Sequence, residues 1–379
     1  MEALRKLGLS EYLIRVIDDY LRDRFLIYET TMGEMRRKLS GGAAQGSVLG
    51  PELWIILYDA LLRLDLPTEV ILEGFADDVA ALILAYSYED AQRLACLVAT
   101  EVNAWLKEHG MALAKAKTEV VVLTAQRWFP SPFRVLVVDQ HIESGAALRY
   151  LGVTIDSKLT FRDQIVSAAN KAATAVASLS RLMPNVGGPM SSRRRALMSV
   201  SNSIMLYRVE VWGEALKVEK YRRKLASVQR RGALRIACAY RTISEAAALV
   251  IAGVIPIDLL EFERKRIWEA RRDGQGSLID VKTREREETL TLWQERWDTE
   301  EKGRWTYRII KGIRDWILRE QGEVDYYLTQ FLSGHGQFNE YLHSMGIRND
   351  PYCQYCPGVV DSAKHTFFDC QRWSEIRSM

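Results

Sequence analysis

Two adjacent carboxylates, Asp77 and Asp78, stand in the stretch GFADDVA, between the apolar runs Val70–Leu72 and Ala81–Leu84. A solvent-facing turn is one explanation, because aspartate is common in tight turns. The apolar flanks instead indicate strands buried on at least one face, where two unneutralised carboxylates favour a bound cation. Mg²⁺ binds through one or two carboxylates together with substrate phosphates. The pair therefore predicts a magnesium site, and two ions there would serve a phosphoryl displacement.

Three cysteines and a histidine near the C-terminus have the spacing of a metal site. Cys353 and Cys356 form a CxxC pair, His365 follows after eight residues, and Cys370 after four more. A set of three thiolates and one imidazole suits tetrahedral zinc. The segment is short and contains proline and glycine, so we expect bound Zn²⁺ to supply much of its folding free energy.

Basic and aromatic side chains surround these four ligands: Arg348, Lys364, Arg372, Arg377, Tyr352, Tyr355, Phe367, Phe368 and Trp373. Together they could stack bases and contact phosphates, as proteins that bind single strands do. Alternatively, the aromatic rings pack the module against the preceding helices. The sequence leaves both interpretations open.

The central part of the chain is strongly basic. Residues 158–241 carry 17 Lys and Arg against 4 Asp and Glu, a net charge of +13, whereas residues 1–157 carry −6 and residues 242–379 carry −4. Such a block indicates a surface for a polyanion, nucleic acid above all. A nuclear localisation signal and a solvated helix face are the alternatives. The candidate nucleic-acid-binding residues are Arg193, Arg194, Arg195, Arg222, Arg223, Lys224, Arg230 and Arg231.

The elements that must position these residues change in kind along the chain. Strands are predicted at 70–76 and 79–85, with the aspartates at their hairpin turn, and a capping box at Ser87 begins a helix that ends at His109. A helix at 3–23, a strand pair at 25–38, a helix at 52–65 and strands at 119–124, 133–138 and 149–155 complete an α+β region. Helices are then predicted at 161–183, 191–216, 218–240, 257–273, 283–301 and 303–320.

The composition is that of a soluble globular protein, with 379 residues, 48% hydrophobic and 27% charged. The length suggests two to four domains. Five cysteines make no disulfide framework, and Cys96 and Cys238 are interpreted as core residues. No apolar run reaches the ~18 residues of a membrane span, so an intracellular protein without a membrane partner is expected.

Four motifs in this order resemble the palm of reverse transcriptases, particularly those of non-LTR retrotransposons. They are SxGxAQGSxLxP at 40–51, FADD at 75–78, GMxLxxxKT at 110–118 and YLGVTID at 150–156. Residues 150–159, 255–260 and 328–336 further resemble type-1 elements of arthropod ribosomal DNA. The resemblance implies an N-terminally truncated palm over 1–157, a basic helical thumb over 158–241, a helical C-terminal region over 242–350 and a Cys-Cys-His-Cys zinc module over 351–379.

The resemblance also implies an activity and its site. Asp77 and Asp78 would be catalytic and hold two Mg²⁺ ions, while Gln45, Gly46 and Ser47 would contact template and nucleotide. Lys117 would lie near the triphosphate. The chain would be part of a nucleotidyltransferase, an RNA-directed DNA polymerase that copies element RNA into DNA at a target-site primer. Its partners would be the RNA template, the DNA primer or target and dNTPs, and it would act in the nucleus.

The sequence also departs from the family. Ala44 replaces the usual proline and Ser40 the usual threonine. The family uses three aspartates, the first on a strand upstream of the Gln-Gly-Ser loop, and only 39 residues precede that loop here. Asp18, Asp19 and Asp59 are better explained as solvated helix positions.

We therefore expect a polyprotein fragment that lacks the first catalytic aspartate, the fingers and the N-terminal endonuclease, and that is inactive alone. One alternative is a degenerate fragment acting only as an RNA- or DNA-binding zinc module. Another is a polymerase of telomere synthesis or intron mobility, against which the zinc cluster argues.

Overall fold

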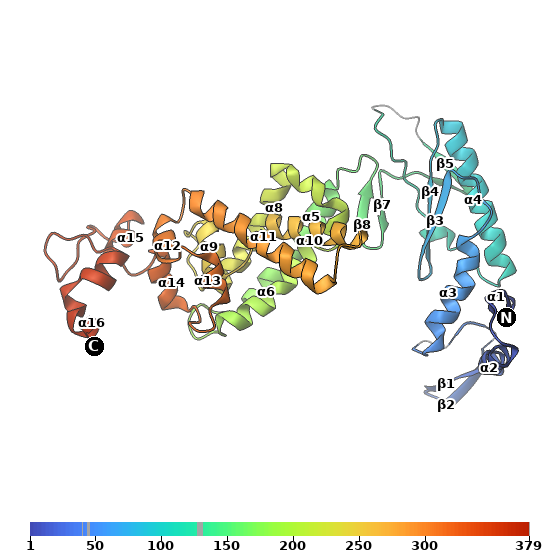
Figure 1. Cartoon of the computed structure of the whole chain (residues 1–379), viewed down its shortest axis with the longest axis horizontal. Coiled ribbons are helices and arrows are strands. Elements are labelled where there is room, and N and C mark those ends of the chain that lie inside the picture. The colour runs from blue at the N-terminus through green and yellow to red at the C-terminus, as the bar shows by residue number, and fades with distance from the viewer. Residues whose placement is uncertain (40, 44–45, 127–131, 379) are drawn as a thin grey trace. The chain divides into compact units, whose positions relative to one another are not determined.

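The protein is described by a computed structural model that covers residues 1–39, 41–43, 46–126 and 132–378. It divides into two compact units, Met1–Leu148 and Arg149–Met379. The first mixes helices with β-hairpins, and the second is mainly helical (Figure 1). This mixture confirms the α+β class predicted from the sequence.

The first unit alternates helices with two-stranded antiparallel hairpins. Its elements are α1 (Glu2–Lys6), α2 (Glu11–Leu21), β1 (Phe25–Thr30), β2 (Gly33–Lys38), α3 (Leu49–Leu62), β3 (Val70–Phe75), β4 (Asp78–Ile83), α4 (Tyr88–Glu108), β5 (Arg134–Val137) and β6 (Gln140–Glu143). The predicted helix at 3–23 is split into α1 and α2. Gly8, with φ of +75°, causes the break, because this left-handed conformation terminates a helix.

The hairpin β3–β4 carries the aspartates and packs against two helices. Its alternate residues Val70, Leu72, Val79 and Ile83 contact a core formed by Tyr58 and Leu61 of α3 with Val98, Val102, Trp105 and Leu106 of α4. The predicted start of α4 is confirmed, since Ser87 caps it by accepting from the Asp90 amide at 3.0 Å. The strand predicted at 119–124 is wrong, because that segment makes only an isolated bridge, Val121 to Gly145.

The second unit is a helical assembly around one large core. Its elements, with the strand pair that leads into it, are β7 (Ala147–Tyr150), β8 (Val153–Asp156), α5 (Arg162–Ser180), α6 (Ser191–Met205), α7 (Val209–Trp212), α8 (Glu219–Ile236), α9 (Glu245–Ala252), α10 (Ile257–Arg272), α11 (Leu278–Thr299), α12 (Arg304–Ile309), α13 (Ile313–Leu318), α14 (Tyr326–Ser333), α15 (Asn339–Ser344) and α16 (Ser374–Ser378). Among the described residues, no helix is long and apolar enough to span a membrane.

The single strand predicted at 149–155 is instead the two strands β7 and β8. They turn at Leu151 and Gly152, whose φ angles are +45° and +83°. Val153 of β8 is buried in the same core as the helices that follow. The compact units therefore divide at Leu148, and the finer division at 157, 241 and 350 remains a prediction.

Candidate functional site

Asp77 and Asp78 lie at the tip of the hairpin β3–β4, as predicted. Phe75 pairs with Asp78, so that Ala76 and Asp77 form a two-residue turn. Ala76 has φ of +54°, an uncommon conformation for a residue with a side chain. Both aspartates are exposed to solvent. The carboxylates are thus accessible to ions and to a large substrate.

Helix α3 fixes this turn through two aromatic side chains that sequence reasoning did not identify. The indole N–H of Trp54 donates to the Ala76 carbonyl at 2.7 Å, and the Tyr58 hydroxyl donates to the Asp77 carbonyl at 3.1 Å. The two rings stack with centroids 5.0 Å apart. Their spacing of four residues, which places side chains on one helix face, was the available sequence signal.

The close approach of α3 to the hairpin depends on Gly74. A Cβ at this position would lie 3.1 Å from the Tyr58 ring and 3.2 Å from Leu62, tighter than ordinary contact. Burial, followed by the charges of Asp77 and Asp78, raises the pKa of Tyr58. Tyr58 therefore stays protonated at neutral pH and can keep donating to the turn.

No third carboxylate joins the pair in the part of the chain that the structure describes. The only described group of three or more side chains close enough to share a metal ion is the cysteine–histidine cluster. Asp18 forms an exposed ion pair with Arg22, and Asp59 forms one with Arg63 at 2.7 Å. Their interpretation as solvated helix positions agrees with this geometry.

The other residues predicted to bind nucleotide lie around the loop before α3 and beyond α4. Gln45 is outside the described residues. Gly46 has φ of +81°, and Ser47 accepts a hydrogen bond from the Gly50 amide at 3.0 Å at the start of α3. Lys117 is exposed at the end of a helical turn, and no ion pair joins it to either aspartate within the described ranges. The roles of Lys117 and of the loop stay predictions from the sequence.

The eight residues predicted to bind nucleic acid differ in whether their side chains already contact other protein groups. Arg222 and Arg223 form ion pairs with Glu219 at 2.6 and 2.5 Å. Arg230 donates to the carbonyls of Arg241 and Ile243. Arg195 donates to the Ala252 carbonyl at 3.1 Å. The side chains of Arg193, Lys224 and Arg231 have no ion pair or hydrogen bond among the described residues, so they are the cations freest to meet phosphate.

Arg194 must be removed from this set. It is only 1% exposed, and its guanidinium donates to the carbonyls of Met183, Pro184, Pro189 and Arg235 at 2.5 to 3.2 Å. Its donors therefore satisfy four backbone acceptors, and phosphate cannot reach them. The buried residues of α6 are Ser191, Arg194, Met198, Ser201 and Met205. Their spacing of three and four residues was a sequence signal for the buried position of Arg194.

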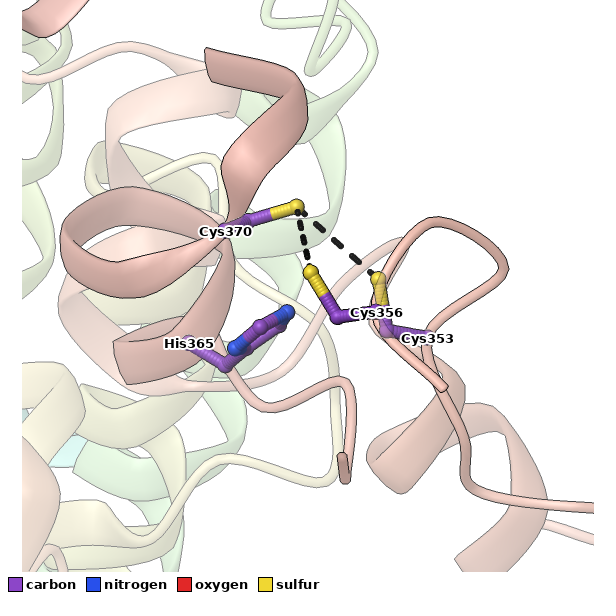
Figure 2. Close-up of side chains that lie close together, drawn as sticks. All are labelled: Cys353, Cys356, His365 and Cys370. Atoms are coloured by element: carbon purple, nitrogen blue, oxygen red, sulfur yellow. Dashed lines mark hydrogen bonds between the residues drawn. The ribbon is translucent and has the colours of Figure 1, made fainter. Parts of the chain in front are cut away.

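The cysteine–histidine cluster converges as predicted, with all four side chains pointing toward one another (Figure 2). The Cys370 sulfur lies 3.8 Å from that of Cys353 and 3.9 Å from that of Cys356, too far for a disulfide. A tetrahedron with metal–sulfur bonds of ~2.3 Å has sulfurs roughly 3.8 Å apart. His365 is 6% exposed, and its Nε2 has no hydrogen-bond partner among the described residues. The four residues thus fit a metal ion.

The aromatic residues near this cluster divide between two kinds of contact. Phe367 packs against Phe331 of α14, with ring centroids 4.2 Å apart. By contrast, the Arg372 guanidinium lies 4.5 Å from the Tyr355 ring centroid and 4.6 Å from that of Trp373. The phenylalanines therefore dock the cluster onto the helices, whereas the stack at Arg372 remains on the surface.

Comparison with known proteins gives a family and relatives. The family model described as "Reverse transcriptase (RNA-dependent DNA polymerase)" matches residues 1–155. A "Retrovirus-related Pol polyprotein from type-1 retrotransposable element R1 2" of Nasonia vitripennis is 27% identical over 361 residues, covering 89% of this chain and 87% of the relative. No solved structure is significantly similar to this chain.

Two further relatives are longer proteins. The "Putative 115 kDa protein in type-1 retrotransposable element R1DM" of Drosophila melanogaster is 26% identical, and a "Retrovirus-related Pol polyprotein from type-1 retrotransposable element R1" of Bradysia coprophila is 25% identical. The alignments cover 100% and 95% of this chain but only 38% and 37% of these relatives. The resemblance inferred from the motifs is thereby confirmed: residues 1–155 match the reverse transcriptase family model, and the chain is similar along most of its length to Pol polyproteins of R1 retrotransposable elements.

Proposed function

We propose that this chain contributes to RNA-directed DNA synthesis by a non-LTR retrotransposon, copying element RNA from a primer at the DNA target. The observation that carries the proposal is the exposed Asp77-Asp78 turn, held by Trp54 and Tyr58 within the segment that matches reverse transcriptases. Two of the similar proteins are named as probable RNA-directed DNA polymerases, from transposon BS and transposon X-element of Drosophila melanogaster.

In this proposal Asp77 and Asp78 hold Mg²⁺ where the primer end meets the incoming dNTP. Bound Mg²⁺ neutralises charge on the phosphates and stabilises the attacking and leaving oxygens. The chain's own residues position the components: α3 fixes the aspartate turn, Gly46 and Ser47 contact template and nucleotide, and Lys117 balances triphosphate charge. Arg193, Lys224 and Arg231 hold the nucleic-acid backbone, and the action is nuclear.

The described residues supply two carboxylates to this site, and the chemistry requires a third. With two, Mg²⁺ binds weakly, so this chain extends a primer poorly or not at all by itself. The remaining polyprotein parts that the family resemblance implies, fingers and endonuclease, are proposed partners. We also propose that the ion held by Cys353, Cys356, His365 and Cys370 is zinc, since three thiolates and one imidazole suit it.

Titration with Mn²⁺, a paramagnetic substitute for Mg²⁺, tests the aspartate site in the presence of a primer–template duplex. Electron paramagnetic resonance measures the free ion, and we expect Asp77→Asn/Asp78→Asn to abolish the weak protein site. The adjacent pair on α2 offers a matched control, because Asp18→Asn/Asp19→Asn removes the same charge elsewhere. Equal Mn²⁺ binding by the two double variants would overturn the assignment.

A second candidate function, nucleic-acid binding without chemistry, is favoured by two observations. The cysteine–histidine cluster has metal-binding geometry, whereas no third carboxylate joins Asp77 and Asp78 in the described chain. This candidate requires that the chain bind nucleic acid independently of Mg²⁺. Measuring affinity for primer–template with and without added Mg²⁺, in the absence of a chelator so that the cysteine–histidine cluster keeps its ion, separates the two, because only the polymerase proposal predicts a contribution from Mg²⁺.

A further inference from the structure

Both strands of the hairpin β1–β2 are exposed along their whole length, from Phe25 to Thr30 and from Gly33 to Lys38. They form a sheet of their own, and no other strand in the described part of the chain pairs with them (Figure 1). An isolated two-stranded hairpin is only marginally stable in water. The unpaired N–H and C=O groups along its edges are a template for a further strand. An additional strand is therefore expected to stabilise this hairpin.

Apolar side chains on β1 and β2 also favour a partner. Tyr28 lies directly opposite Met35, with Leu26 on the same face, whereas Phe25 and Ile27 lie on the other face. Leu26, Ile27 and Met35 are 49%, 57% and 50% exposed. Adjacent exposed apolar residues typically mark an interaction surface. The hairpin thus combines open backbone edges with uncovered apolar side chains.

The charges on β2 show which partner fits its edge. Glu34 lies directly opposite Glu29 of β1, and like charges in that position destabilise a strand pair. Arg36 stands two residues further along β2, on the same face as Glu34. Its guanidinium lies 3.7 Å from the centroid of the Phe25 ring and makes no ion pair among the described residues. One strand therefore carries an unneutralised carboxylate and an unneutralised cation that point to the same face.

We propose that β2 pairs antiparallel with β2 of a second copy of this chain. The two-fold axis passes beside Met35, so that this residue faces its own counterpart. Glu34 then faces Arg36 of the second copy, and Arg36 faces Glu34 of the second copy. A two-fold axis perpendicular to the sheet keeps each side chain on its own face, which is why residues 34 and 36 can meet. The two hairpins become one sheet of four strands, joined by two ion pairs.

Self-complementary charge favours a second copy over other occupants. The other edge, β1, carries Glu29 as its one charged residue and has no cation for it to meet. A nucleic-acid strand would be attracted by Arg36 but repelled by Glu29 and Glu34. Two six-residue strands make a small interface, so we expect a dissociation constant in the micromolar range. Self-association at β2 does not depend on polymerase chemistry.

Sedimentation equilibrium of the full chain without nucleic acid, from about 1 to 100 µM, should show a monomer–dimer equilibrium. Arg36→Glu places carboxylates opposite each other, and Glu34→Arg places cations opposite each other. Each variant should raise the dissociation constant at least about tenfold. Arg37→Glu is the matched control. It makes the same charge change on the opposite face, where the residue facing it is Gly33, so the dissociation constant should change by less than about threefold.

Mixing the two single variants separates pairing from folding. Arg36→Glu has carboxylates at both positions and Glu34→Arg has cations at both, so a mixed dimer regains two pairs of opposite charge. We expect each variant alone to be monomeric at concentrations where the mixture dimerises. The double variant Glu34→Arg/Arg36→Glu exchanges the two charges and should dimerise like the unsubstituted chain.

Three results would overturn the proposal. The first is a chain that stays monomeric at the highest concentration, which would leave the hairpin to another part of a longer polyprotein. The second is a dimer that both charge reversals leave intact, because another surface would then form it. The third is primer–template binding that Arg36→Glu weakens and Glu34→Arg strengthens, with association unchanged, which would assign β2 to nucleic acid. The proposed function is tested separately, by Mn²⁺ binding at Asp77 and Asp78.

Discussion

The hydroxyl of Tyr58 and the main-chain carbonyl of Asp77 are joined by a hydrogen bond of 3.1 Å. One residue of α3 therefore restrains the turn that presents both aspartates. We predict that Tyr58→Phe destabilises the first unit by about 0.5–1.5 kcal/mol, the usual net contribution of one hydrogen bond. It should also weaken Mn²⁺ binding, because the turn becomes less ordered. Urea unfolding and Mn²⁺ titration measure the two effects.

Tyr86→Phe is the matched control for this prediction. Tyr86 is fully exposed, at 106% of its reference area, so loss of its hydroxyl should change neither stability nor ion binding. If Tyr58→Phe lowered stability without affecting Mn²⁺, Tyr58 would be a folding residue only, and the link between the turn and the ion would be wrong.

Metal removal should unfold the C-terminal module. The cluster's sulfurs and imidazole are buried, and the surrounding segment has little other core. We predict one zinc ion per chain, and increased hydrogen exchange over residues 351–378 after chelation, with the helical core protected. Co²⁺ substitution should give the visible spectrum of a tetrahedral site with three sulfurs and one nitrogen.

Cys370→Ser should lower metal affinity by more than about tenfold. Even substitution of a residue that only hydrogen-bonds to a metal ligand lowers the affinity about 10- to 100-fold. Cys96→Ala is the control, because Cys96 lies in the first unit outside the cluster. Stoichiometric, tight Co²⁺ binding by Cys370→Ser would contradict the assigned ligand set.

The three free cations of the helical region should contact nucleic acid, whereas Arg194 should not. Charge reversal of Arg193, Lys224 and Arg231 should weaken binding of primer–template without lowering the melting temperature. Replacement of any one of these three residues by Ala should reduce the slope of log affinity against log salt concentration by about 0.7–0.9. Fluorescence anisotropy of a labelled primer–template at several salt concentrations measures this slope. Unchanged slopes in all three Ala variants would show that the nucleic acid binds to another surface.

Arg194→Met should act through stability instead. The substitution leaves four carbonyl acceptors without their donor, so we expect a loss of at least about 3 kcal/mol in the free energy of unfolding. Arg193→Met is the neighbouring control, because Arg193 is exposed and should lose little stability. A stable Arg194→Met variant with weakened nucleic-acid binding would restore Arg194 to the binding set.

The sequence predicted the parts of this site that depend on local pattern. The apolar runs on either side of Asp77-Asp78 predicted the hairpin, and Ser87 predicted the start of α4. The spacing of the three cysteines and the histidine predicted the metal ligands. It did not predict the contacts of Trp54 and Tyr58 with the turn, because these join segments about twenty residues apart through tertiary packing.

Other features missed by sequence reasoning have similar physical causes. Helix α9 reads EAAALVIA, which is apolar on all faces, so it shows no helical period to detect. The burial of Arg194 was obscured by the neighbouring arginines, since charge counts do not show which member of a basic triplet faces the core.

Stability should also depend on pH through Glu323. Hydrogen bonds from Ser191 and Ser192, with Ser191 contributing most, lower the pKa of Glu323 from 4.5 to about 2. Because the folded pKa lies below the unfolded value, this stabilisation is fully present above pH 4.5 and is lost as pH falls toward 2. Glu323→Gln should therefore lower stability at neutral pH. It should also make stability depend less on pH between 4.5 and 2.

Glu320→Gln is the control, because Glu320 lies three residues earlier on the same exposed segment. It should leave the dependence of stability on pH unchanged. Thermal melting between pH 2 and pH 7 measures both variants. Identical acid profiles for Glu323→Gln and the unsubstituted chain would show that the contact between Glu323 and the start of α6 does not stabilise the fold.

The central claim is that this chain carries the aspartate pair of a polymerase site that its described residues do not complete. Primer extension on an RNA template with Mg²⁺ and dNTPs tests it most directly, with Asp77→Ala/Asp78→Ala as the paired variant. We predict that both proteins bind primer–template in a salt-dependent manner and that neither extends the primer. Extension by the unsubstituted chain that is lost in the double variant would contradict the claim, because the third carboxylate would then lie within this chain.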